Sequence, residues 1–109
     1  MPLYLVRFSY TAEAWKNLIE NPADRRGPVE ALVESVGGKL HGFWYAFGEQ
    51  DGVVLVEAPS NVDAASLSVT ASASGGIKAT EMTVLMTVEE LVEALERASK
   101  LSLEPPRGA

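Results

Sequence analysis

The stretch Gly37–Pro59, GGKLHGFWYAFGEQDGVVLVEAP, decides the fold. Its two apolar and aromatic runs, Lys39–Phe47 and Val53–Ala58, have the composition of β-strands. The polar segment Gly48–Gly52 between them is short enough to form a hairpin turn. The pair Gly37-Gly38 is typical of the C-terminus of a helix. This stretch therefore predicts a helix followed by two antiparallel strands.

The flanking sequence completes an alternating pattern of strands and helices. Strands are predicted at Leu3–Tyr10 and Ile77–Met86, and helices after Thr11, from about Pro28, at Ser60–Ser74 and after Thr87. Because βαβ connections are right-handed, both helical connections should cover the same face of one antiparallel sheet. The sequence thus predicts an α+β, ferredoxin-like βαββαβ sandwich with strand order 4-1-3-2 and an extra C-terminal helix. Residues 1–103 are expected to form this domain, and residues 104–109, with two prolines, a flexible tail.

Composition and charge exclude several classes of function. The chain has 109 residues, a formal net charge of −6, no cysteine and one histidine. An acidic chain without a basic cluster is unsuited to nucleic acid, so no nucleic-acid partner is expected. Without cysteine, it cannot form a disulfide or use a thiolate, and one histidine cannot form a His-rich zinc site. We find no signal peptide and no apolar run of about 20 residues, so we expect a cytoplasmic protein with no membrane partner and no cofactor.

One face of the predicted sheet is left without helices. Side-chain alternation along the first three strands assigns eight residues to this open face: Leu5, Arg7, His41, Phe43, Tyr45, Phe47, Leu55 and Glu57. The alternate positions, which include Tyr4, Val6, Phe8, Trp44, Val54 and Val56, are assigned to the core beneath the helices. Such a face is too apolar for water, so we expect a second copy of the chain to cover it and form a homodimer or a higher homo-oligomer. Whether His41 and Glu57 share this face depends on the hairpin register, because a shift of one residue turns every side chain over.

Five of these side chains are candidate ligand-binding residues: Arg7, His41, Phe43, Tyr45 and Glu57. His41 is also the candidate catalytic residue, because a neutral imidazole can act as a general base near neutral pH. The alternative is an interface histidine that is hydrogen-bonded to a neighbour. Arg7 and Glu57 either anchor a polar ligand or form an ion pair buried between subunits. Tyr45 and Phe43 either contact a ligand or only pack, and Asp51 is interpreted as a turn residue.

The pieces GGKLHGFWYAFGEQD and LMTVEE, within a likeness that runs from about Leu3 to Ala98, resemble the GYD-domain family. These small bacterial proteins are assigned to the ferredoxin-like, dimeric α/β-barrel group, so the resemblance implies that fold and a homo-oligomer. The family is named after a Gly-Tyr-Asp signature, to which Gly48 and Asp51 correspond here, whereas Gln50 stands where tyrosine is usual. The family has no established reaction. The wider group includes cofactor-independent monooxygenases, isomerases, haem-using peroxidases and small-molecule sensors.

Three functions remain open from the sequence. We expect binding of a small apolar or aromatic molecule in a cavity between the open sheet face and the partner subunit. The alternative is a cofactor-independent monooxygenase or isomerase with His41 as general base and Arg7 or Tyr45 stabilising an oxyanion. A further alternative is a purely structural assembly subunit. Haem ligation by His41 would need a much larger cavity.

Overall fold

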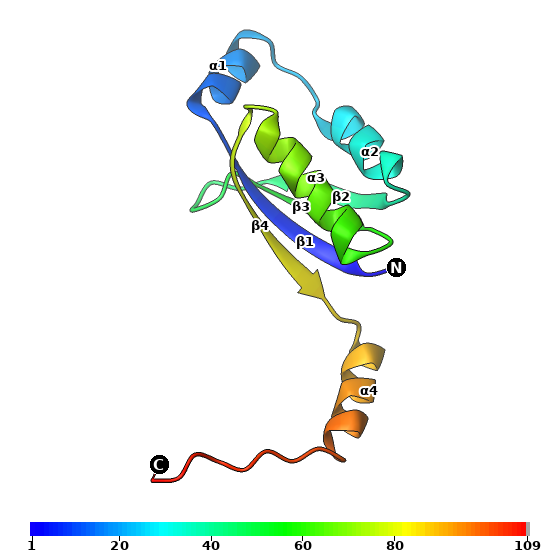
Figure 1. Ribbon diagram of the computed structural model, residues 1–109. Helices are drawn as coiled ribbons and strands as arrows, with labels where there is room; N and C mark the ends of the chain where they lie inside the picture. The colour runs from blue at the N-terminus through cyan, green and yellow to red at the C-terminus, as the bar shows by residue number, and fades with distance from the viewer. Residues whose placement is uncertain (109) are drawn as a thin grey trace.

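The computed structural model describes residues 1–108 (Figure 1). Four strands and four helices follow one another along the chain: β1 (Leu3–Tyr10), α1 (Ala12–Glu20), α2 (Arg26–Ser35), β2 (Lys39–Tyr45), β3 (Gly52–Glu57), α3 (Asn61–Ala73), β4 (Ile77–Leu85) and α4 (Val88–Ala98). The helix starts follow the sequence signals. Thr11 caps α1, Ser60 caps α3, and Thr87 and Glu90 form the predicted capping box of α4.

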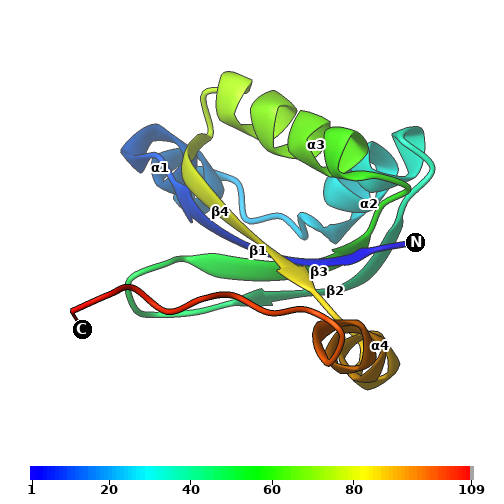
Figure 2. The same cartoon turned by 60° about the horizontal axis from the view of Figure 1, so that its bottom comes forward.

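The strands form one antiparallel sheet in the order β2-β3-β1-β4. This is the predicted ferredoxin-like order 4-1-3-2 counted from the other edge, so the predicted fold class is confirmed. Helices α1, α2 and α3 lie on one side of the sheet, whereas α4 lies on the other side (Figure 2). The two sides are called the helix side and the open face below.

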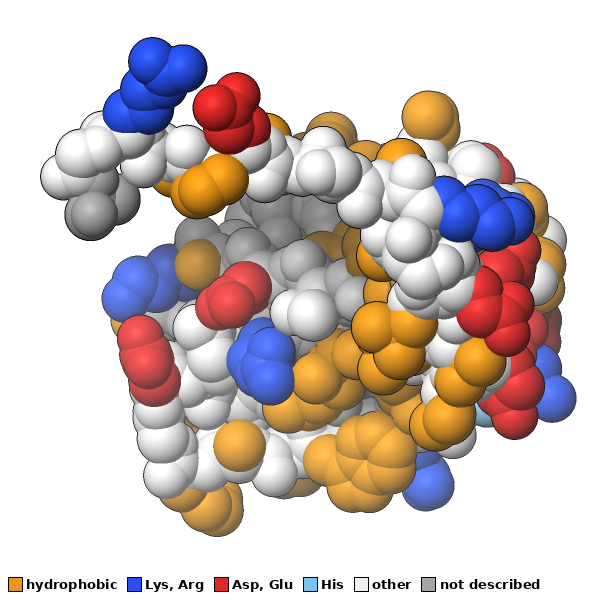
Figure 3. Space-filling view, turned by 90° about the horizontal axis from the view of Figure 1, so that it is seen from below, with side chains coloured by type: hydrophobic (Ala, Val, Ile, Leu, Met, Phe, Trp, Pro, Cys, Tyr) orange, Lys and Arg blue, Asp and Glu red, His pale blue; other side chains and the backbone are white. Residues whose placement is uncertain are grey.

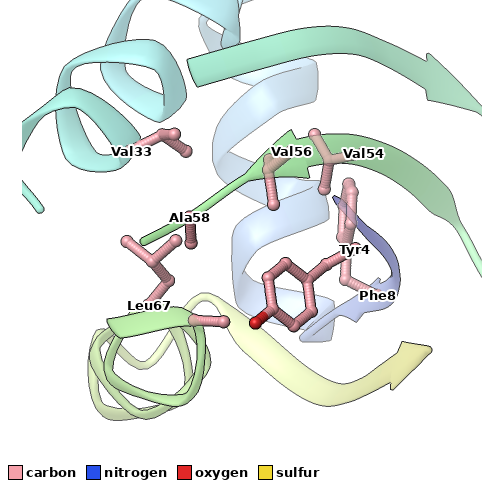
Figure 4. Close-up of a cluster of buried hydrophobic side chains, with 8 residues drawn as sticks. Tyr4, Phe8, Val33, Val54, Val56, Ala58 and Leu67 are labelled. Carbon is pink, nitrogen blue, oxygen red and sulfur yellow. The ribbon is translucent and has the colours of Figure 1, made fainter. Parts of the chain in front are cut away.

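The core lies between the sheet and helices α2 and α3. Its buried residues are Tyr4, Phe8, Val33, Val54, Val56, Ala58, Ala64 and Leu67. Figure 4 shows the side chains of β1 and β3 directed toward those of α2 and α3. Tyr4 is 1% exposed, and its hydroxyl donates a 2.6 Å hydrogen bond to Oδ1 of Asn61 at the start of α3. The predicted helix-side positions of β1 and β3 are therefore confirmed.

The end of α2 is a Schellman motif, as the glycine pair predicts. Gly37 has a φ of +78°, and its N–H donates to the carbonyl of Glu34 over 2.9 Å. The N–H of Gly38 donates to the carbonyl of Val33 over 3.0 Å. Gly38 also lies against the carbonyl of Glu57, so this turn holds the end of α2 against the end of β3.

The β2–β3 hairpin has a longer loop than predicted, and its register, which the sequence left open, is now defined. Tyr45 lies opposite Gly52, so β2 ends two residues earlier than predicted, and residues 46–51 form the loop. An even number of loop residues would direct His41 and Glu57 to opposite faces. The pairing shifts by one residue between Leu40 and Gly42, where His41 forms a β-bulge, so Lys39 rather than Leu40 lies opposite Glu57.

Because of this register, part of the predicted open face was wrong. Phe43 lies opposite Val54 and packs against the core, and Tyr45 lies on the same side of β2. Trp44, which the alternation assigned to the core, lies opposite Val53 on the open face and is 55% exposed. Phe47 belongs to the hairpin loop, not to a strand.

Helix α4 extends away from the sandwich, together with residues 99–108 (Figure 1). Its apolar side chains recur at helical spacing, and Leu91 and Leu95 are 51% and 59% exposed. A helix with one apolar stripe normally buries it against another surface. The predicted tail, residues 104–109, includes Ala109, which lies outside the described residues.

Candidate functional site

The imidazole of His41 and the carboxylate of Glu57 form a pair on the open face. Nε2 of His41 lies 2.8 Å from Oε1 of Glu57, and each side chain is about one third exposed (32% and 31%). Since an ionised carboxylate only accepts hydrogen bonds, Nε2–H is the donor and Nδ1 of a neutral ring is left as a proton acceptor. A carboxylate that orients an imidazole in this way is an arrangement suited to general-base chemistry.

The β-bulge brings these two groups together. Lys39 lies opposite Glu57, and the extra residue at His41 keeps the imidazole on the same side of the sheet. The indole of Trp44 packs over Gly42, where a β-carbon would clash with the ring. Gly42 therefore allows a large aromatic side chain to lie flat on the open face beside the pair.

Arg7 lies elsewhere on the open face. It is opposite Val53 of β3 and Glu81 of β4. Glu57 lies opposite Leu3, which is four residues from Arg7 along β1. At about 3.3 Å per residue, this separates Arg7 and Glu57 by roughly 13 Å along the strands. Arg7 borders a hollow of about 360 Å³, which the hairpin-loop residues Gly48, Glu49 and Gln50 also line. Within one chain, Arg7 and the His41–Glu57 pair are thus two separate polar sites on one apolar face.

Gln50 and Asp51, at the positions of the family signature, form hydrogen bonds that hold the hairpin loop in place. Oδ2 of Asp51 accepts hydrogen bonds from the backbone N–H of Tyr10 over 2.8 Å and from Nε1 of Trp15 over 3.3 Å. Oε1 of Gln50 accepts a 3.1 Å hydrogen bond from the hydroxyl of Ser9. These bonds fasten the loop to the end of β1 and the start of α1, in agreement with the structural reading of Asp51.

The other two candidates, Phe43 and Tyr45, join an aromatic cluster on the helix side. The ring centroids of Phe8 and Phe43 are 5.6 Å apart, and those of Phe43 and Tyr45 are 5.1 Å apart. The hydroxyls of Tyr45 and Tyr10 lie 3.0 Å from each other. Burial, reinforced by this hydrogen bond, raises the pKa of Tyr10 above its ordinary value, so the phenol stays neutral. The sheet thus separates Phe43 and Tyr45 from Arg7, His41 and Glu57.

A cavity of about 230 Å³ lies on the helix side, where the sequence pattern predicts a filled core. Besides apolar side chains, its wall includes Arg25 and Ser68. The sequence signal was present in α3, where Ala64, Ser68 and Ala71 recur at helical spacing. Such small residues on the inner side of a helix leave space beneath it.

The described part of the chain offers no group of three His, Cys, Asp or Glu side chains that could hold a metal ion. Within residues 1–108, none of the helices is long and apolar enough to cross a membrane.

The fold places the protein among the ferredoxin-like α+β domains. The model of the GYD domain matches residues 4–95, and the chain belongs to this family. The fold is similar to two solved structures, each 16% identical in sequence. One is the crystal structure of FFRP-DM1, with a TM-score of 0.56 over 79% of this chain and 100% of the other. The second is the solution structure of the C-terminal domain of the MgtC protein from Mycobacterium tuberculosis, with a TM-score of 0.54 over 78% and 88%. None of the curated proteins compared with the chain matches it.

Proposed function

We propose that the protein is a homo-oligomer that binds a small apolar or aromatic molecule between its open sheet face and the same face of a second copy. The observation that carries this proposal is the open face itself. It combines the half-exposed indole of Trp44 and the leucines Leu3, Leu5 and Leu55 with Arg7 and the His41–Glu57 pair. Figure 3 shows hydrophobic side chains gathered on the underside of the molecule, with acidic side chains along one edge. Apolar surface of this kind favours a covering partner.

A two-fold arrangement suits the charges of this face. Two sheets packed face to face lie about 10 Å apart. Consider a two-fold axis that lies between the two sheets, runs across the strands and passes the paired residues Leu5 and Leu55. This pair is midway along the strands between Arg7 and Glu57, so the rotation would place Arg7 of one copy opposite the Glu57 position of the other. The cation and carboxylate that are separated within one chain would then meet across the interface, and the hollow beside Arg7 would become enclosed.

Helix α4 supports the same partner. It projects on the side of the open face, and its apolar stripe includes Leu91 and Leu95, both exposed (Figure 2). In a homo-oligomer, the apolar stripe of α4 in each copy would pack against the apolar surface of its neighbour. The same association would thus bury the stripe of α4 and the open face.

Ligand binding at the open face is tested by titrating the protein with a panel of phenols and of neutral indoles, followed by heteronuclear NMR. We expect saturable shifts at Arg7, Val53 and Glu81, which surround the hollow. Arg7→Gln should weaken binding about tenfold, because it removes a charge-assisted hydrogen bond. Lys16→Gln, an exposed change on α1, is the matched control and should bind like the wild type. If no compound of the panel shifts the resonances around the hollow while the oligomer stays intact, the ligand-binding proposal is wrong. The protein would then be a structural subunit without a ligand.

The His41–Glu57 pair favours one second candidate function, an enzyme that removes a proton from an activated C–H group. In this function Nδ1 of His41 accepts the proton and Glu57 stabilises the imidazolium that forms. It is tested by deuterium exchange into enolisable keto acids in D₂O. His41→Ala should lower the exchange rate at least 100-fold, whereas Lys16→Ala on α1, an exposed residue on the other side of the sheet, should leave it unchanged. Equal exchange rates in His41→Ala and wild type would eliminate this candidate.

A further inference from the structure

The cavity on the helix side can hold a ligand of its own. It measures about 230 Å³ and lies between the sheet and helices α2 and α3, with Leu32, Phe43 and Met82 among the apolar side chains of its wall. A dry apolar cavity of about 150 Å³ is large enough for benzene. The helix-side cavity therefore has room for a six-membered ring with a substituent or for a short alkyl chain.

A hydroxyl group in the wall lacks a partner. Oγ of Ser68 is shielded from solvent and forms no hydrogen bond with any group in residues 1–108. Ser68 belongs to the wall of the cavity, on the inner side of α3. Buried hydroxyls in folded proteins are nearly always hydrogen-bonded, so a ligand with an oxygen atom would complete this site.

A cation lies at the opening of the cavity. Arg25 belongs to the wall and is also exposed to solvent, which places it at the rim. Its neighbour Arg26 is paired with Asp24 over 2.6 Å, whereas Arg25 takes part in no ion pair with the described residues. A guanidinium group matches a carboxylate with two parallel hydrogen bonds.

We propose that the helix-side cavity binds a small monocarboxylate with an apolar body. The ring or alkyl chain lies against Leu32, Phe43 and Met82. The carboxylate accepts hydrogen bonds from Arg25 at the rim and from the unpartnered hydroxyl of Ser68 in the wall. This site is on the opposite side of the sheet from Arg7 and from the His41–Glu57 pair, so it is independent of the function proposed above.

The test is a heteronuclear NMR titration of the full chain with octanoate and with phenylacetate. Their uncharged analogues, 1-octanol and phenylacetamide, are titrated in parallel. We expect saturable shifts at Leu32, Phe43 and Met82, and about tenfold weaker binding of the uncharged analogues. Arg25→Gln should weaken carboxylate binding to the level of the analogues. Arg26→Gln, the same change at the adjacent residue, should bind like the wild type.

A second variant tests the cavity rather than the charge. Ala71→Leu adds a side chain to the inner side of α3 and should abolish binding, with a spectrum that shows the fold retained. Arg7→Gln on the open face should leave octanoate binding unchanged, which separates this site from the open-face site. The proposal is overturned if neither carboxylate gives saturable shifts at the cavity. Undiminished binding in Ala71→Leu or in Arg25→Gln would also overturn it.

Discussion

Leu55→Asp is expected to dissociate the protein into monomers with a retained fold. Leu55 lies at the centre of the open face, opposite Leu5 of β1 and Gly42 of β2. In the proposed oligomer, each copy would bury a new carboxylate against apolar side chains, and an unpaired buried charge costs several kcal/mol. In a monomer, the same carboxylate would face water and cost little. Sedimentation equilibrium should therefore show the mass of a single chain, 11.7 kDa, for this variant.

Val69→Asp is the matched control for this experiment. Val69 is an apolar residue, 67% exposed, on α3 and therefore on the other side of the sheet. The change adds the same charge to the chain, so a general effect of charge on association would appear in both variants. We expect Val69→Asp to keep the mass of the wild type. An unchanged oligomer in Leu55→Asp would show that the chain associates through another surface.

Gly38→Ala is expected to lower the free energy of unfolding by roughly 3 kcal/mol, near the upper end of the usual cost of overpacking. A β-carbon at Gly38 would clash with the backbone carbonyl of Glu57 and would lie 3.0 Å from Cγ1 of Val33. A backbone carbonyl cannot swing aside as a side chain can, so the end of α2 must move away from β3. Since Glu57 holds the imidazole of His41, the resonances of His41 should shift as well.

Gly27→Ala, at the start of α2, provides the contrast to Gly38→Ala in the turn after the end of α2. A β-carbon at Gly27 would meet no atom within 4 Å, and alanine favours helix over glycine by about 0.5–1 kcal/mol. Chemical denaturation at equal protein concentration should show opposite effects for the two changes. Equal stability of Gly38→Ala and wild type would mean that α2 and β3 do not approach each other as described.

The order of the elements and the core positions of β1 and β3 could be predicted from the sequence. Tyr4 and Phe8 are buried, whereas Leu5 and Arg7 on the opposite side of β1 are only partly buried, so the two sides follow the alternation of the sequence. The signals at helix ends were equally local, such as the glycine pair after α2 and the capping box at Thr87. These features depend on residues close together in the sequence.

The sides of β2 could not be predicted, because both sets of alternate residues in this strand contain aromatic side chains. The pairing of Tyr45 with Gly52 depends on the length of the loop, which sets the side of Phe43, Trp44 and Tyr45. The bulge at His41 inserts one residue, so the alternation of sides changes again between Gly42 and Leu40. Phe43 and Trp44 were therefore assigned to the wrong faces, although His41 and Glu57 do lie together. The helix-side cavity was missed because the space beneath α3 depends on how far the helices lie from the sheet.

The mass of the wild-type protein in solution tests the central claim most directly. Sedimentation equilibrium across a 100-fold range of protein concentration should show a whole-number multiple of 11.7 kDa, with two or more chains per particle. A mass of 11.7 kDa throughout that range would contradict the claim that a second copy covers the open face.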